Sequence, residues 1–398
     1  MTLELNMFQT CALGAIVFII GSWLVKKIAV FRQYCIPAPV VGGLLFAILH
    51  LILRQAGILE IYFEFTDGST PTLQTVFMTI FFCSVGFTAC FSMLKKGGVQ
   101  VLMLLGVVVV LITCQDIIGV VASKVMGISP KLGLLMSSIP LVGGHGTAAS
   151  FGPLVEESYG IAGASTVAIA SATYGLVAGG IIGGPLARSH VKRLNLHSTE
   201  TEAGGEGNGT AGTIDEGRFM HAALFLAIGI GLGTLVYNFF MSIHFTLPTY
   251  IGAMLVACVI RNIWDVRKLD FPLEEIETLG GVSLNLFLSM AMMTLKLWQL
   301  AGLALPMIVI LLIQTVFMAL YAYFVVFNIM GRDYEAAAMV TASCGFGLGA
   351  TPNAMANMKA LTSQYGPAPR AFFIVPLVGS LFSDFFNGGI ATAFMNFF

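Results

Sequence analysis

Two glycine-rich stretches carry residue types that can bind small ions inside a membrane protein. The first is Gly143-Gly144-His145-Gly146-Thr147-Ala148 and the second is Gly345-Phe346-Gly347-Leu348-Gly349-Ala350-Thr351-Pro352. Dense glycine and proline make a helix costly, so we expect non-helical backbone in both. At membrane depth such backbone occurs only where protein buries it or where it lines a cavity.

Main-chain N–H groups at a helix start bind anions, and free carbonyls bind cations. Nearby hydroxyl, amide and imidazole groups add further donors and acceptors. The predicted substrate-binding residues are Gly143, Gly144, His145, Gly146, Thr147, Gly345, Gly347, Gly349, Thr351 and Asn353. Two plainer interpretations stay open: small residues let helices pack closely, and polar side chains bond to their own helix backbone.

Acidic and polar residues inside apolar runs are the second set of candidates. Asp384 lies midway along the last apolar run, where a lone carboxylate costs about 2.5–3.5 kcal/mol on insertion scales. It either holds a cation or pairs with a substrate ammonium. Asn387 lies three positions on, on the same helix face. The predicted cation-binding residues are Ser343, Asp384 and Asn387.

Asp116 is a second intramembrane acid, next to Gln115. It is either a member of the site or a residue near the outer end of its span that meets water. Gln115 and Gln314 are candidates for either site residues or helix–helix contacts.

The composition is that of an all-α polytopic membrane protein. Of 398 residues, 57% are hydrophobic and 10% charged, against about 25% charged in soluble proteins. The net charge of −1, without a basic cluster, gives no sign of a nucleic-acid partner. The seven cysteines include no C-x-x-C pair, so we expect small buried hydrophobic side chains rather than a zinc site.

The sequence contains ten apolar runs besides the two glycine-rich stretches, and most approach the length of a spanning helix, although the run that begins at Pro248 is short. The runs are 7–25, 36–53, 73–94, 98–123, 161–187, 219–245, 248–260, 279–300, 301–330 and 371–398. If the stretches near 132–151 and 336–358 are re-entrant hairpins, 15 of the 19 Lys and Arg residues fall on one side. This bias predicts ten transmembrane helices, both termini outside and a cytoplasmic linker.

The two halves of the chain look like duplicates. Residues 1–196 form the first repeat, 197–217 a flexible polar linker and 218–398 the second repeat. Gln115 matches Gln314, and Gly146 matches Gly349. Five spans per half is an odd number, so the repeats are predicted to be inverted, as in many secondary transporters.

These motifs closely resemble the bacterial sodium/glutamate symporter family. The likeness covers nearly the full length and includes both glycine-rich stretches, residues 36–43 and 179–185, and Leu295-Lys296-Leu297-Trp298. The chain differs from the family pattern at Ala38 and Ser343. The resemblance implies Na⁺-coupled import of L-glutamate across the inner membrane, a five-plus-five inverted topology and a homodimer within membrane lipid. With an inner-membrane location, the outside termini predicted from the Lys and Arg positions are periplasmic.

Two alternative transport functions are compatible with the same sequence features. A proton-coupled transporter or an exporter of another dicarboxylate would use the same fold. The sequence has no H-E-x-x-H, G-x-S-x-G or G-x-x-x-x-G-K-[ST] motif, so we expect neither an enzyme nor a nucleotide-driven pump. We expect alternating access around two hairpins that meet near the midplane.

Overall fold

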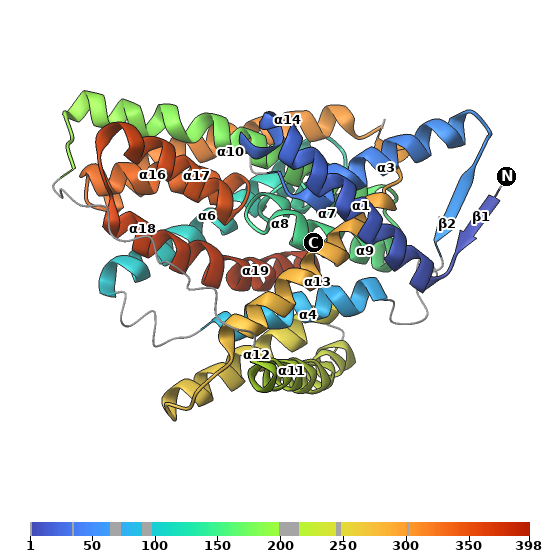
Figure 1. Cartoon of the computed structure of the whole chain (residues 1–398). Helices are drawn as coiled ribbons and strands as arrows, with labels where there is room; N and C mark the ends of the chain where they lie inside the picture. Colours follow the sequence, from blue (N-terminus) through green and yellow to red (C-terminus); the bar gives the residue numbers. More distant parts are fainter. Residues whose placement is uncertain are drawn as a thin grey trace.

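Helices make up almost all of the protein in a computed structural model that describes residues 2–33, 36–63, 73–89, 98–198, 215–243, 248–300 and 302–398 (Figure 1). The first half contains β1 (Thr2–Leu5), α1 (Met7–Lys27), α2 (Ala29–Gln33), α3 (Ala38–Gln55), β2 (Glu60–Phe63), α4 (Leu73–Thr88), α6 (Gly98–Val125), α7 (Pro130–Leu134), α8 (Ser138–Leu141), α9 (Gly144–Tyr159) and α10 (Ala164–Leu194).

The second half is entirely helical among the described residues. It contains α11 (Glu216–Ser242), α12 (Thr249–Val266), α13 (Leu273–Met293), η2 (Leu297–Leu300), α14 (Ala304–Leu320), η3 (Tyr321–Val326), α15 (Phe327–Ile329), α16 (Tyr334–Leu348), α17 (Thr351–Tyr365), α18 (Pro369–Pro376), η4 (Leu377–Phe382) and α19 (Ser383–Phe397). The segments η3 and η4 are π-helical turns within long helices.

Eight helices of the described residues are long and apolar enough to cross a membrane. The protein is therefore an all-α, multi-pass membrane protein. The predicted run 279–300 is misplaced, because α13 begins earlier, at Leu273, and ends at Met293. Glu274 and Glu275 lie in its first turn, where carboxylates interact favourably with the helix dipole. Most of the predicted linker and residues 90–94 of the third run lie outside the described residues.

The helices pack in two groups. In one group, α1, α3, α4, α11, α12 and α13 pack against each other, and in the other α6–α10 pack with α14–α19. Figure 1 shows α11, α12, α4 and α13 in the lower part of the view, with α10, α16 and α17 above them. Both glycine-rich stretches belong to the second group, with α9 also contacting α13 of the first.

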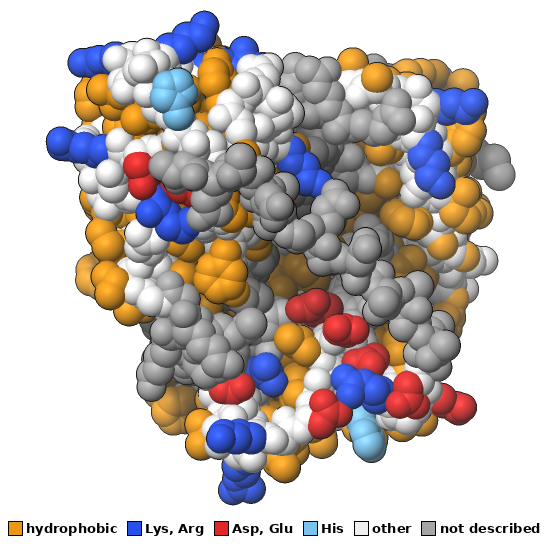
Figure 2. Space-filling view, turned by 60° about the vertical axis from the view of Figure 1, so that its left-hand side comes forward, with side chains coloured by type: hydrophobic (Ala, Val, Ile, Leu, Met, Phe, Trp, Pro, Cys, Tyr) orange, Lys and Arg blue, Asp and Glu red, His pale blue; other side chains and the backbone are white. Residues whose placement is uncertain are grey.

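Chain segments predicted to lie in the cytoplasm share one end of the molecule. Ser198, before the linker, donates to the carbonyl of Pro367 in the α17–α18 turn. Arg193 donates to the Tyr323 hydroxyl of η3. Figure 2, turned so that the left-hand side of Figure 1 comes forward, shows Lys and Arg side chains spread around this face.

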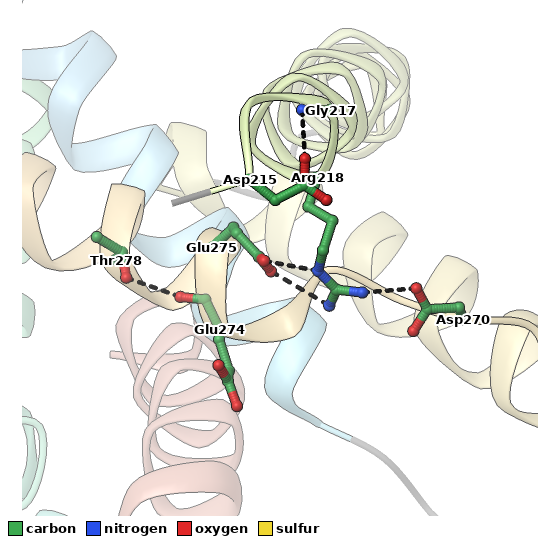
Figure 3. Close-up of polar contacts among 7 residues, drawn as sticks. All are labelled: Asp215, Gly217, Arg218, Asp270, Glu274, Glu275 and Thr278. Atoms are coloured by element: carbon green, nitrogen blue, oxygen red, sulfur yellow. Dashed lines mark hydrogen bonds and ion pairs between the residues drawn. The ribbon is translucent and has the colours of Figure 1, made fainter. Parts of the chain in front are cut away.

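Charged side chains on the same face also join helices. The Arg218 guanidinium of α11 binds both carboxylate oxygens of Glu275 in α13, at 2.7 and 3.4 Å, and one oxygen of Asp270, at 2.6 Å (Figure 3). Asp215 caps α11 by accepting from the main-chain N–H of Gly217. These contacts tie the start of α11 to the start of α13.

Segments predicted to lie outside meet at the opposite end. The Arg54 guanidinium lies 3.9 Å from the ring centroid of Trp298, and the Lys124 ammonium lies 4.5 Å from that of Phe398. Here β1 and β2 form a parallel two-stranded sheet that the sequence analysis did not predict. The strands lie at the right of Figure 1.

Candidate functional site

The first glycine-rich stretch is more helical than predicted. The helix breaks at residues 135–137 and 142–143, and α9 begins at Gly144, so His145, Gly146 and Thr147 occupy its first turn. The expectation of non-helical backbone throughout is therefore wrong. Only Gly144, with φ +64°, needs a conformation that favours glycine.

The second stretch breaks at Gly349 and Ala350 alone, because α16 continues through Gly345 and Gly347 and α17 begins at Thr351. The two helices run antiparallel in close contact. A Cβ atom at Gly345 would lie 2.5 Å from the Ala354 Cα, and the Asn357 amide donates to the Thr341 carbonyl at 3.3 Å. Here glycine serves close helix packing, the plainer of the two interpretations.

Both stretches return to the end of the molecule from which they start. The Lys131 ammonium at the start of α7 lies 4.2 Å from the ring centroid of Tyr159, the last residue of α9. The Tyr334 hydroxyl at the start of α16 donates to the carbonyl of Gly366, just after α17. Each stretch is thus a helical hairpin. We call residues 130–159 the first hairpin and residues 334–365 the second.

Helix α10 packs into the second hairpin along a row of glycines. A Cβ at Gly175 would lie 1.9 Å from the Leu348 carbonyl oxygen, and one at Gly183 would lie 2.9 Å from that of Thr341. This pairing is antiparallel, and it brings the end of α16 to the middle of α10. The Asn353 amide adds a hydrogen bond of 2.9 Å to the Leu176 carbonyl.

The tips of the two hairpins meet. A Cβ at Gly144 would lie 3.2 Å from the Gly349 carbonyl oxygen. The helix starts at Gly143 and Ala350 have no side-chain cap. In α17, Pro352 has no N–H and the Asn353 N–H donates to the Ala350 carbonyl at 3.0 Å, so the open N–H groups belong mainly to the first turn of α9. An uncapped helix N-terminus beside the second hairpin suits an anionic ligand.

Several predicted side chains instead bond within the protein. Thr147 donates to the Gly143 carbonyl of its own helix at 3.0 Å, and Thr351 donates to the Gly379 carbonyl in η4 at 2.9 Å. His145 Nε2 lies 3.0 Å from the Thr173 hydroxyl of α10. Gly146 faces the Phe81 and Phe82 rings. These contacts within the protein therefore fix the positions of the four residues around the junction between the hairpin tips.

Gln115 is a connecting residue whose role the sequence left open. Its side-chain amide donates to the Gly347 carbonyl at 2.9 Å, and its main-chain carbonyl accepts from the Gln314 side-chain amide at 2.8 Å. The two matched glutamines therefore join α6, α14 and the second hairpin.

The three predicted cation-binding residues occupy different surroundings. Asn387 is fully buried, and its amide donates to the Ser138 carbonyl of the first hairpin at 3.1 Å. Asp384 is half-buried and lies within electrostatic range of the buried Tyr250 hydroxyl. Ser343 is buried in α16, and its hydroxyl has no hydrogen-bond partner among the described residues. No hydrogen bond in the described part of the chain joins the three directly.

A cavity of about 380 Å³ lies beside the first hairpin, at the end of the molecule predicted to be outside. It is lined by Ser150, Glu156 and Glu157 of α9, Thr166 of α10 and Lys296. None of the predicted site residues lines it, although Ser150 follows Thr147 by less than one helical turn. Its polar and charged wall suits a zwitterionic or anionic solute.

The fold defines the class of protein first: a multi-pass, all-helical membrane protein with two helical hairpins that meet at their tips. Comparison with known proteins then identifies the family. The sequence profile of the sodium/glutamate symporter family matches residues 3–367. The chain belongs to that family.

Individual relatives cover almost the whole chain. It is 40% identical over 395 residues to the sodium/glutamate symporter of Escherichia coli, spanning 96% of each sequence. It is 37% identical over 398 residues to that of Haemophilus influenzae, spanning 98% of this chain and 97% of the relative. The resemblance inferred from the motifs is confirmed.

Proposed function

We propose that this protein imports L-glutamate together with Na⁺ across the bacterial inner membrane by alternating access. The observation that carries the proposal is the junction between the hairpin tips, where Gly144 meets Gly349. The uncapped first turn of α9 and the Thr351 N–H at the start of α17 offer donors to the substrate carboxylates. The names of the relatives supply the two solutes.

We further propose ten transmembrane helices in two inverted repeats, with each hairpin re-entrant and both termini periplasmic. Supporting this topology, Lys131 and Tyr159 lie together at one end, and Tyr334 and Gly366 lie together near the other. Hairpins that enter from opposite sides and meet midway are typical of secondary transporters. The cavity lined by Lys296 then serves as an outer vestibule, where the ammonium attracts carboxylates.

The mechanism follows from the two groups of helices. The hairpins, α6, α10, α14 and α18–α19 move as a unit against the group that contains α1, α3 and α11–α13. The exposed apolar faces of α1 and α11, which include Ile19 and Leu235, contact lipid or a second subunit of a homodimer.

The substrate cannot be bound by N–H groups alone, because its ammonium also needs a partner. Asp384, near the buried Tyr250, is proposed either to hold Na⁺ or to pair with that ammonium. Ser343 and Asn387 are proposed cation ligands. Whether Asp384 holds Na⁺ or pairs with the ammonium, one positive charge offsets the Asp384 carboxylate.

Radiolabelled L-glutamate uptake into proteoliposomes tests this function. Wild-type protein should accumulate glutamate with an inward Na⁺ gradient and not with a proton gradient. Asp384→Asn should lower uptake by about tenfold or more, as expected for an intramembrane acid at a functional site. Asp270→Asn, whose carboxyl is 82% exposed, is the matched control. Accumulation driven by a proton gradient instead would point to a proton-coupled transporter.

A further inference from the structure

A cluster of buried oxygen atoms lies where α6, the first hairpin and α19 meet. Asp116, Ser138 and Asn387 are all 0% exposed. The Ser138 main-chain N–H donates to one Asp116 carboxylate oxygen at 3.2 Å. The Ser138 carbonyl accepts from the Asn387 amide at 3.1 Å. Both side chains are therefore held by the main chain of the same residue, Ser138.

Each of the three side chains keeps one oxygen unused. Asp116 Oδ2, Ser138 Oγ and Asn387 Oδ1 have no hydrogen-bond partner among the described residues. The Ser137 and Ser138 hydroxyls nevertheless lie close enough to interact with the Asp116 carboxyl. Leaving a buried polar atom without a partner costs about 1–3 kcal/mol. The carboxylate, hydroxyl and amide oxygens of three neighbouring side chains are therefore acceptors available to a positively charged ligand.

We propose that Asp116, Ser138 and Asn387 form a Na⁺ site, an inference that rests on the proposed sodium-coupled function. Carboxylate, hydroxyl and amide oxygens are the ligands that hard cations prefer. The site has a single formal negative charge. Among the described residues, no three His, Cys, Asp or Glu side chains lie close enough together to hold a metal ion. A monovalent ion therefore leaves the site neutral, whereas a divalent ion would leave a buried net charge.

This position also explains how ion and substrate sites communicate. A Cβ at Gly143, just before α9, would lie 2.6 Å from the Asn387 amide nitrogen. The neighbouring Gln115 holds the Gly347 carbonyl of the second hairpin. An ion bound at Asp116 thus orders both hairpin tips, and it prepares the helix starts that bind the carboxylates.

The second half of the chain lacks the same chemistry. The spacing that relates Gly146 to Gly349 relates Ser138 to Thr341, which is also buried with an unpartnered hydroxyl. Asp116 is replaced there by Thr315, whose hydroxyl donates to the Leu311 carbonyl at 2.8 Å. Without a carboxylate, the Thr341 position does not hold the ion, and it provides a matched control.

The test is ²²Na⁺ binding to the purified full-length protein in detergent, in the absence of glutamate, with K⁺ and choline as competing cations. Asp116→Asn, Ser138→Ala and Asn387→Ala should each weaken Na⁺ binding by about tenfold or more. Thr341→Ala should bind Na⁺ as the wild type does. Ser138→Ala removes a single oxygen atom and is expected to fold even if Asp116→Asn does not.

The proposed site is overturned if Ser138→Ala binds Na⁺ as tightly as the wild type, and if Asp116→Asn and Asn387→Ala, where they fold, do so too. A result in which Asp116→Asn abolishes only the pH dependence of uptake also overturns it, because Asp116 would then carry a proton. Glutamate uptake by the wild-type protein distinguishes a failure of the proposed Na⁺ site from a failure of the proposed function. If wild-type uptake is driven by Na⁺ while the variants bind Na⁺ normally, the site is wrong and the function stands. If wild-type uptake ignores Na⁺, the function itself fails.

Discussion

At the residue scale, the site depends on a few atoms at the hairpin tips. Gly144 has a positive φ and faces the Gly349 carbonyl, whereas most of the other glycines in the two stretches are helical. Asp116 and Asn387 both bond to the main chain of Ser138, and each has one oxygen without a hydrogen-bond partner among the described residues. Chemistry at this junction therefore comes from the break points and from buried acids, rather than from glycine content as such.

Gly144→Ala should lower glutamate uptake several-fold while leaving the amount of folded protein nearly unchanged. An alanine at φ +64° costs roughly 1–2 kcal/mol, and its Cβ would press on the Gly349 carbonyl at 3.2 Å. Uptake per unit of purified protein measures the effect. Gly106→Ala, in open space on α6, should transport normally. Wild-type uptake in Gly144→Ala would show that the two tips need not meet.

At the element scale, helix α10 holds the second hairpin in place. Its glycines allow backbone-to-backbone contact with α16, and Asn353 and Asn357 of α17 donate to its carbonyls. The polar bonds and the close packing act together, because each is possible only when the helices approach closely.

Gly175→Ala should prevent this approach and reduce the yield of folded protein. Its Cβ would lie 1.9 Å from the Leu348 carbonyl oxygen, and overpacking of this kind costs about 1–3 kcal/mol or more. Size-exclusion chromatography in detergent and thermal unfolding report the loss. Gly184→Ala lies on the same helix in open space and should behave as the wild type. Equal stability of the two variants would contradict this packing.

Arg218→Ala should lower the unfolding temperature by a few degrees, because it removes the bidentate contact between α11 and α13 (Figure 3). Asp270→Asn should have a smaller effect, since that carboxylate is 82% exposed and exposed ion pairs contribute little. Thermal unfolding at low and high salt provides the measurement. The difference between wild type and Arg218→Ala should shrink at high salt. A difference that is independent of salt would indicate lost packing instead.

At the scale of the whole molecule, the group of helices that contains both hairpins packs against the group formed by α1, α3, α4 and α11–α13. Lys and Arg residues gather at one end, and the cavity with Lys296 lies at the other. This polarity predicts which residues face each side of the membrane.

Single cysteines introduced into a variant that lacks the seven native ones test that orientation. Thr294→Cys, in the cavity, should react with a membrane-impermeant maleimide in intact cells. Ser363→Cys, exposed on α17, should react only after permeabilisation. Ser289→Cys, at a position that is 0% exposed, should react in neither case. The reverse labelling pattern would invert the proposed topology.

Much of this protein follows from its sequence, because a bilayer restricts the possible structures. Apolar runs of spanning length must be helices, and the positions of Lys and Arg orient them. The motifs were specific enough to reveal the family, and each glycine-rich stretch lies at the turn of a helical hairpin. The start of α13 was missed because its first turn carries Glu274 and Glu275, which lower the local hydropathy. The pairing of β1 with β2 was missed because it joins residues far apart in the chain.

Only the tertiary structure decided which atoms come together. The sequence predicts Gly345 and Gly347 as site residues, and the structure adds that Gly345 packs against α17 and Gly347 against α14. Asp116 and Asn387 are 271 positions apart, and only folding brings both to Ser138. Sequence patterns report local periodicity and hydropathy, whereas a binding site depends on distances between helices, which packing alone determines.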